Sequence, residues 1–80
     1  MYHVYILVSR KNLTKCYIGF TNSLEKRMNK YNTNQTYYAK RYAPWELRAY
    51  ISFERKKKAL NFEKYLKQGS GFAFLKRHLI

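Results

Sequence analysis

The sequence predicts a small α/β (α+β) domain in which a three-stranded antiparallel sheet is flanked by helices. The chain has 80 residues, 46% of them hydrophobic, which is enough for one compact core and leaves little room for a second. Segments with alternating apolar residues predict strands, and segments with apolar residues three and four positions apart predict helices. In chain order these segments are strand, strand, helix, strand, helix, helix. We expect residues 1–80 to form a single domain.

The first two predicted strands form a hairpin. Residues 2–8 carry apolar side chains on both alternating faces, so we expect this strand at the centre of the sheet. A turn over residues 10–15 leads to a returning strand over residues 16–20. In a suitable register, Tyr5 and Tyr17 share one face of the sheet, toward the helix that follows.

The segment after the hairpin predicts a tight turn at Gly19 and then a helix that extends to Tyr31. We expect Asn22 to be the N-cap, with Glu25 three residues later completing a capping box. Arg27 lies at the edge of an apolar stripe, so its guanidinium neighbours a phenol. The stripe consists of Leu24, Met28 and Tyr31.

The middle of the chain has a less regular pattern. Residues 32–42 are rich in Asn, Thr, Gln and Tyr without a clear period, which predicts a loop. Both a substrate-facing segment and an ordinary exposed connection fit this composition. After Pro44, alternation predicts a third strand with one buried face, formed by Leu47, Ala49, Ile51 and Phe53.

The second predicted helix, residues 55–67, has a carboxylate on its apolar face. Glu63 lies one turn from both Ala59 and Leu66, so we expect it to be partly buried. Such a charge needs a partner. An ion pair with Lys67 or with an arginine of the first helix would satisfy it, and so would a divalent metal ion. Residues 69–71 end this helix, and a last helix is predicted over 72–79.

The chain is strongly basic, with 17 Lys and Arg residues, four Glu, no Asp and a net charge of +13. These cations are interleaved with nine Tyr and five Phe, which favours nucleic acid as the partner. A self-repelling surface, or a basic protein without catalysis, is the alternative. The candidate nucleic-acid contacts are Lys26, Lys30, Lys40 and Arg41, and the start of the second helix, Arg55, Lys56, Lys57 and Lys58.

Other sequence features narrow the setting. Cys16 is the only cysteine, so no intramolecular disulfide is expected and a cysteine-based zinc cluster is excluded. No apolar segment approaches the roughly 20 residues that a membrane span needs, and no signal-peptide pattern is present. We therefore expect no membrane partner and a cytoplasmic protein.

Two triplets on the paired strands, together with later motifs, resemble a known family. They are His3-Val4-Tyr5 and Tyr17-Ile18-Gly19, followed by residues 21–27 at a helix start. Further on stand Pro44-Trp45-Glu46-Leu47, residues 59–67 and Gly69-Ser70-Gly71. In this order and spacing the set resembles the GIY-YIG nuclease superfamily, and within it the small single-domain, excinuclease-like bacterial members.

The resemblance implies a mechanism and a set of site residues. It implies that Glu63 binds one divalent ion, Mg²⁺ or Mn²⁺, against the scissile phosphate, and that Arg27 stabilises charge on the phosphoryl oxygens. It also implies that Tyr5 and Tyr17 position or deprotonate the attacking water, and we expect the cationic site to lower the tyrosine pKa values. Tyr31 stands where many members have His, as in the repair-nuclease branch, so a phenol takes that role.

Two function hypotheses follow. The first is a metal-dependent DNA endonuclease, with a role in DNA repair, that binds phosphate backbones nonspecifically through its own charge and prefers DNA to RNA. The alternative is a nucleic-acid-binding module that keeps the scaffold and has weak or no turnover. A third reading is a domain that acts only when joined to a partner protein.

Overall fold

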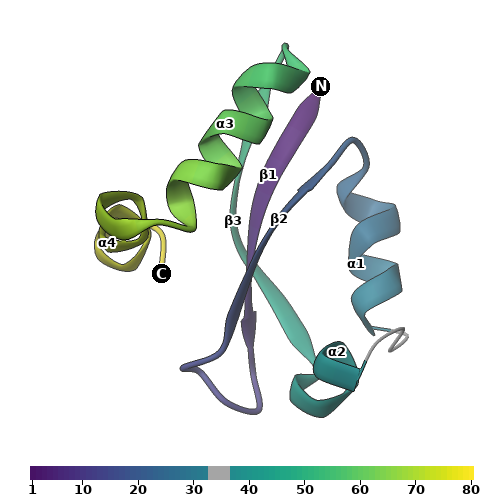
Figure 1. The fold of residues 1–80 in the computed structure, drawn as a ribbon. Helices are drawn as coiled ribbons and strands as arrows, with labels where there is room; N and C mark the ends of the chain where they lie inside the picture. The colour runs from purple at the N-terminus through teal and green to yellow at the C-terminus, as the bar shows by residue number, and fades with distance from the viewer. Residues whose placement is uncertain (33–36) are drawn as a thin grey trace.

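The computed structural model describes residues 1–32 and 37–80 and contains a three-stranded antiparallel sheet with the order β2-β1-β3. The strands are β1 (Tyr2–Ser9), β2 (Cys16–Thr21) and β3 (Trp45–Phe53), seen edge-on in Figure 1. The central position predicted for the first strand is confirmed. Its residues 4–9 are all buried, because β1 has a neighbouring strand on each edge and helices on both faces.

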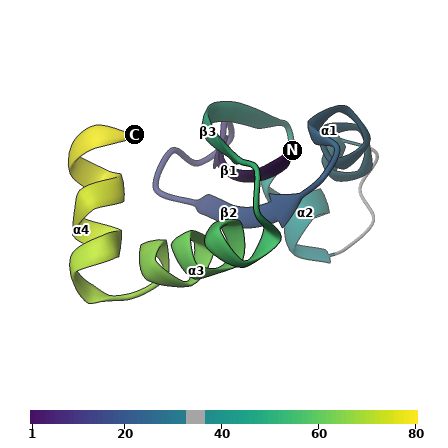
Figure 2. The same cartoon turned by 90° about the horizontal axis from the view of Figure 1, so that it is seen from above.

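Four helices are described: α1 (Leu24–Asn32), α2 (Tyr37–Tyr42), α3 (Lys56–Leu66) and α4 (Gly69–His78). The predicted fold class and order of elements are confirmed, with α2 as an additional short helix. Helices α1 and α2 lie on one side of the sheet, and α3 and α4 lie on the other (Figures 1 and 2). None of the described helices is long and apolar enough to cross a membrane.

The two faces of the sheet belong to two separate cores. On the α3 and α4 side the buried residues are Val4, Ile6, Ile18, Ala59, Leu66 and Leu75. On the α1 and α2 side they are Tyr5, Leu7, Tyr31, Ala39 and Trp45. The first core is aliphatic and the second is mainly aromatic. The aromatic core also includes the tyrosines expected to carry the chemistry.

The loop predicted over residues 32–42 is wrong in part. Asn32 ends α1 and Tyr37–Tyr42 form α2, whereas residues 33–36 lie outside the described part of the chain. Ala39 is buried against Trp45, whose indole Nε1–H donates a hydrogen bond to the Ala39 carbonyl at 3.0 Å. This helix therefore depends on a tertiary contact and has no sequence period long enough to reveal it.

The single buried face predicted for the third strand is also wrong. Leu47 pairs with Leu7 and Ala49 pairs with Ile6, so the register shifts between these pairs and leaves Arg48 as an extra residue. Because one extra residue reverses the alternation, Leu47 packs in the aromatic core while Ala49 packs in the aliphatic core.

The start of α1 differs from the predicted capping box. The N-cap is Ser23, whose Oγ accepts a hydrogen bond from the Lys26 N–H at 3.4 Å. The Thr21 hydroxyl accepts from the Ser23 N–H at 3.0 Å and donates to the Ser23 carbonyl at 3.1 Å. This local turn moves the helix start one residue beyond Asn22. Gly19 is inside β2 rather than at a turn.

The last helix begins three residues earlier than predicted, at Gly69. Gly69 has a φ of +26°, which other residues rarely adopt, and it is the first residue of α4, directly after the connection from α3. Gly71 lies where α4 crosses α3. A Cβ built there would be only 1.7 Å from the Tyr65 carbonyl oxygen, so glycine permits this close crossing.

Candidate active site

Three tyrosines from three elements form one cluster on the α1 face of the sheet. Tyr5 of β1 stacks with Tyr17 of β2 at a ring-centroid distance of 6.4 Å. Tyr31 of α1 lies 6.4 Å from the Tyr5 ring and 5.0 Å from the Tyr17 ring. Burial has the largest effect on the pKa values of Tyr5 and Tyr31, and hydrogen bonding among the three phenols has a smaller effect. The fold thus brings together the three phenols that the sequence analysis selected.

Gly19 gives the Tyr5 side chain its place. The two residues are directly opposite each other in the β1–β2 pairing. A Cβ on Gly19 would be 2.1 Å from the Tyr5 hydroxyl oxygen and 2.2 Å from Cζ, so only glycine leaves room for the phenol. The turn predicted at Gly19 is therefore wrong, and the sequence alone does not indicate this role. The register that reveals the role is a property of the folded sheet.

Arg27 lies on α1 next to the tyrosine cluster, and its positive charge acts to lower the pKa of Tyr5. None of the three ion pairs in the described residues involves this guanidinium. A hollow of about 230 Å³ at the start of α1 is lined by Thr21, Asn22, Ser23, Lys26, Arg27 and Lys30. Three cations and several hydroxyl and amide groups around one small hollow suit a phosphate group.

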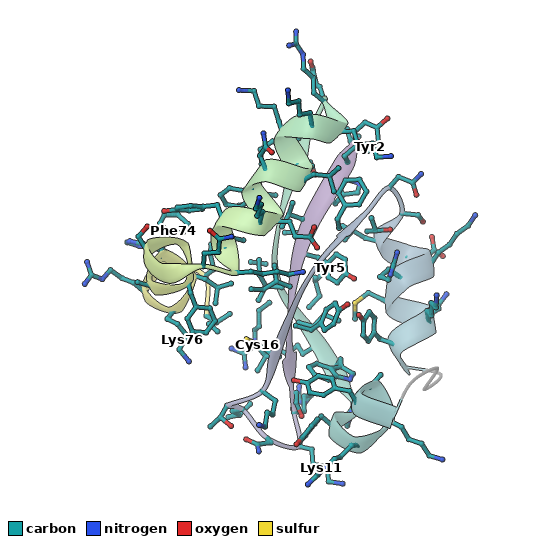
Figure 3. The ribbon with its side chains drawn as sticks, viewed as in Figure 1. Tyr2, Tyr5, Lys11, Cys16, Phe74 and Lys76 are labelled. Atoms are coloured by element: carbon teal, nitrogen blue, oxygen red, sulfur yellow. The ribbon has the colours of Figure 1, made fainter. Side chains whose placement is uncertain are left out.

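Glu63 lies on α3, on the other side of the sheet from α1. Its side chain is 20% exposed, and its carboxylate accepts a hydrogen bond from Lys67 Nζ at 3.2 Å. The ion pair proposed from the sequence is therefore present. The negative charge of Glu63 also contributes to raising the pKa of Tyr5, after the larger effect of burial. Figure 3 shows Tyr5 between α3 and α1, the helices that carry Glu63 and Arg27.

The expectation that the cationic site lowers the tyrosine pKa values is wrong for two of the phenols. Burial raises the pKa of Tyr5, which is 1% exposed, and this outweighs the opposing effects of the Tyr31 hydrogen bond and Arg27. Burial raises the pKa of Tyr31 as well, because a phenolate there would lose its hydration. Both phenols stay protonated at neutral pH and act as hydrogen-bonding groups.

The raised pKa values predict a loss of stability in alkali. Below about pH 10 the phenols are protonated in both the folded and the unfolded chain, and they leave stability unchanged. Above that pH the unfolded chain releases these protons first, so each buried phenol removes up to about 1.4 kcal/mol of folding free energy per pH unit. Urea unfolding between pH 8 and pH 11 should show a shallower decline for Tyr31→Phe than for the wild type. Equal slopes would contradict the prediction.

The basic residues predicted to bind nucleic acid fall into three groups. Lys26 and Lys30 line the hollow with Arg27, while the exposed Lys40 and Arg41 lie on α2. The third group is exposed at the start of α3, at the opposite end of the molecule from α2 (Figure 1); it consists of Arg55, Lys56, Lys57 and Lys58. The tyrosine cluster lies between these two ends of the molecule. A nucleic-acid strand bound across the cluster would therefore meet cations both toward α2 and toward the start of α3.

The side chains at this site fit a single hard divalent cation. Mg²⁺ and Mn²⁺ take oxygen ligands, and Mg²⁺ is commonly held by one or two carboxylates together with water and substrate phosphate. Glu63 supplies a partly exposed carboxylate, and its charge acts on Tyr5 of the tyrosine cluster. In the described part of the chain no group of three His, Cys, Asp or Glu side chains comes together. Water and phosphate oxygens would therefore complete the coordination.

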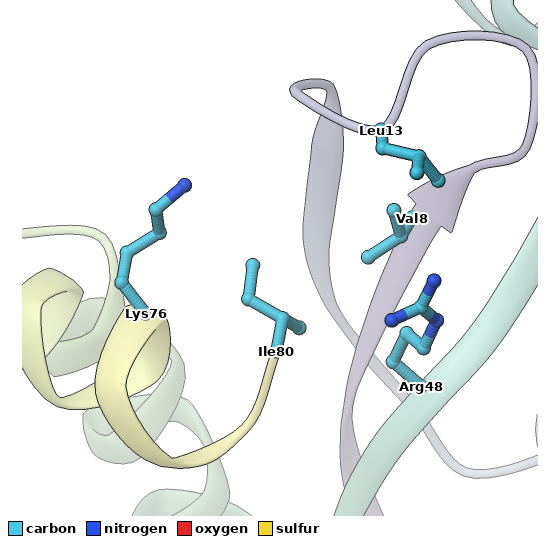
Figure 4. Close-up of a pocket in the computed structure, with 5 residues that line it drawn as sticks. All are labelled: Val8, Leu13, Arg48, Lys76 and Ile80. Carbon is cyan, nitrogen blue, oxygen red and sulfur yellow. The ribbon is translucent and has the colours of Figure 1, made fainter.

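Another cavity, of about 320 Å³, lies away from this site (Figure 4). It is lined by Val8, Leu13, Arg48, Lys76 and Ile80, which are mostly apolar. Its arginine already donates to Glu46 at 2.9 Å. None of the catalytic candidates lines this cavity. Cys16, the only cysteine, is a free thiol.

The fold and the site define an α/β domain with a cluster of three phenols, a guanidinium and a carboxylate that act on this cluster from opposite helix layers, and a cationic hollow at the start of α1. The chain matches the model of the GIY-YIG catalytic domain over residues 1–76, and it therefore belongs to the GIY-YIG family. This is a family of nucleases, so its substrates are nucleic acids. Its members typically use a divalent metal ion. Neither a curated protein nor a solved structure matches the chain.

Proposed function

We propose that the protein is an endonuclease that hydrolyses phosphodiester bonds in DNA with one divalent metal ion. The observation that carries the proposal is a cluster of three phenols on whose Tyr5 both Arg27 and Glu63 act electrostatically, from helices on opposite faces of the sheet. If Arg27 and Glu63 formed an ion pair with each other, that pair would explain both residues without any role in catalysis. Here Glu63 is paired with Lys67 instead, which leaves the guanidinium available to a phosphate.

The residues divide the chemistry among themselves. In hydrolysis the oxygen of a water molecule bonds to phosphorus, one P–O ester bond breaks, and the departing oxygen takes a proton. The guanidinium of Arg27 stabilises the charge that builds on the phosphoryl oxygens. The neutral hydroxyls of Tyr5, Tyr17 and Tyr31 accept and donate hydrogen bonds, and so orient the attacking water.

Glu63 is the residue that would hold the metal. A bound Mg²⁺ or Mn²⁺ would polarise the phosphate and stabilise the departing oxygen. Lys67 Nζ forms an ion pair with this carboxylate at 3.2 Å from Glu63 Oε2. This exposed pair is weak, of about 0.5 kcal/mol or less, so a divalent ion can displace the ammonium at little cost.

The alternative function is a nucleic-acid-binding module without useful turnover. The Lys67 ion pair favours it, because the carboxylate has a partner without any metal. The net charge of +13 supports both functions equally. We further propose that the chain belongs with the small single-domain bacterial members, acts in the cytoplasm in DNA repair, and binds DNA rather than RNA.

Nicking of supercoiled plasmid tests the proposal. We expect the wild type to convert the plasmid to its open form with Mg²⁺ or Mn²⁺ and to lose this activity in EDTA. Arg27→Ala should slow nicking by about 10²-fold, since one charge-stabilising donor is lost. Arg77→Ala, which removes an exposed arginine on α4, is the matched control and should have little effect.

Two results would contradict the proposal. Nicking that survives unchanged in Arg27→Ala would identify a contaminating nuclease. DNA binding without nicking in either metal would establish the binding module instead.

A further inference from the structure

A basic and aromatic hollow lies beside α2, at the opposite end of the molecule from the start of α3. It has a volume of about 340 Å³ and is lined by Lys11, Asn12, Arg41 and Tyr42. Lys15 Nζ lies 5.5 Å from the centre of the Tyr42 ring, and Arg41 Cζ lies 5.3 Å from it. Figure 3 shows Lys11 at this end of the molecule, beside α2. The hollow has room for about one nucleotide and is far too small for a duplex.

Buried hydrogen bonds hold the walls of this hollow in place. Ser9 is fully buried, and its hydroxyl donates to the Tyr42 carbonyl at 2.5 Å. The same oxygen accepts from the backbone N–H groups of Lys11 at 3.1 Å and Asn12 at 3.0 Å. One serine thus ties the hairpin turn to the end of α2. The lining residues come from two elements that are fastened together, so the hollow is formed before any ligand binds.

An exposed ring lies next to the hollow and is supported from behind. Tyr38 stacks on Trp45 at 5.6 Å with an interplanar angle of 28°, and it contacts the Tyr42 ring at 5.0 Å. Tyr38 is nevertheless 39% exposed. Trp45 supports the ring from one side, and the exposed part of Tyr38 is accessible to a flat ligand. Trp45 is buried and held by its hydrogen bond to Ala39, so the platform is rigid.

The platform connects directly to the tyrosine cluster. Trp45 contacts Tyr31 at 6.2 Å on one side and Tyr38 at 5.6 Å on the other. Three ring contacts, Tyr42 to Tyr38, Tyr38 to Trp45 and Trp45 to Tyr31, therefore connect the hollow to the phenols of the active site. A strand that leaves the active site toward α2 would reach it within a few nucleotides.

We propose that Tyr38 and the hollow beside it bind an unpaired nucleotide of the substrate strand, so that the enzyme selects DNA with a single-stranded segment next to the cleavage site. This inference rests on the proposed nuclease function. The base stacks on Tyr38, and the adjoining phosphates bind Lys11, Lys15 and Arg41. Stacking requires a base whose face is free. Paired bases in a duplex already stack on each other, so the platform discriminates between the two forms.

Binding of labelled DNA in EDTA, where cleavage is blocked, tests the inference. The probes are an oligothymidylate of about ten nucleotides and a duplex of equal length. We expect the single strand to bind more tightly than the duplex. Tyr38→Ala should weaken binding of the single strand about tenfold and leave duplex binding unchanged. Tyr38→Phe, which keeps the ring, should bind like the wild type.

The controls use comparable residues on the opposite face of the sheet. Tyr65 on α3 is 42% exposed, and Tyr65→Ala should not alter the preference for the single strand. Lys11→Gln should reduce the slope of log affinity against log salt by about 0.7 for the single strand, whereas Lys64→Gln should not. The Lys11 measurement also decides the question if Tyr38→Ala fails to fold.

Equal affinity for single strand and duplex would overturn the inference, as would equal losses in Tyr38→Ala and Tyr65→Ala. These outcomes are independent of the proposed function. Selective binding without nicking would refute the nuclease and keep the binding site. Nicking without selectivity would keep the nuclease and refute the site.

Discussion

Glu63→Gln is expected to reduce Mg²⁺-dependent nicking by about a thousandfold. The amide keeps the shape of the side chain but loses the charge that a hard cation requires. Metal-ion stabilisation of a phosphoryl transition state amounts to several kcal/mol, and each 1.4 kcal/mol or so changes the rate tenfold. The measurement is the initial rate of plasmid nicking at saturating Mg²⁺, with DNA binding in EDTA measured alongside.

The controls separate a catalytic Glu63 from a structural one. Glu54→Gln neutralises an exposed carboxylate in the connection between β3 and α3 and should leave the nicking rate unchanged. Lys67→Gln removes the ion-pair partner and should lower the Mg²⁺ concentration needed for half-maximal nicking, because the ammonium no longer competes for the carboxylate. A Glu63→Gln enzyme as active as the wild type would refute the metal-binding role.

Gly19→Ala is expected to lower both stability and the nicking rate. The new Cβ would fall 2.1 Å from the Tyr5 hydroxyl oxygen and 2.8 Å from Cε1. Tyr5 is 1% exposed and packed between Tyr17 and Tyr31, so its ring has little room to move aside. Overpacking of this kind destabilises by about 1–3 kcal/mol. Urea unfolding measures this change, and nicking by the folded protein reports the displaced hydroxyl.

Gly71→Ala is the matched comparison for Gly19→Ala. Its Cβ would meet the Tyr65 carbonyl oxygen at 1.7 Å, where α4 crosses α3, away from the tyrosine cluster. We expect a loss of stability at least as large, because a helix backbone yields less than the end of a side chain. The protein that remains folded should nick at close to the wild-type rate. If both variants lose activity only in proportion to unfolding, Gly19 has no specific role at the site.

Predictions from local sequence patterns were wrong where a strand contains a bulge and where a helix depends on a tertiary contact. Arg48 is one extra residue in β3, and it places Leu47 and Ala49 on opposite faces although they are two positions apart. Helix α2 depends on the burial of Ala39 against Trp45 and on one hydrogen bond from the indole. Neither can be read from alternation or helical spacing, because both depend on residues paired from distant parts of the chain.

The sequence indicated which residues form the candidate site better than it indicated their protonation. The apolar stripe of α1 placed Tyr31 and Arg27 side by side, and the odd carboxylate on the apolar face of α3 singled out Glu63. The direction of the tyrosine pKa shifts was wrong, because positive charge is visible in the sequence and burial is not. The hollow beside Tyr42 combines a hairpin turn with α2, and only the fold brings them together.

The sequence by itself determined the class of fold, the central strand and the basic character, and it singled out Tyr5, Tyr17, Arg27, Tyr31 and Glu63 as candidate site residues. These properties depend on periodicity and composition, which are local. Only the tertiary structure decided that Gly19 makes room for Tyr5, that burial keeps Tyr5 and Tyr31 protonated, and that Glu63 reaches the site from the opposite helix layer. Each of these depends on strand register or on exclusion of water, and both arise when distant segments pack together.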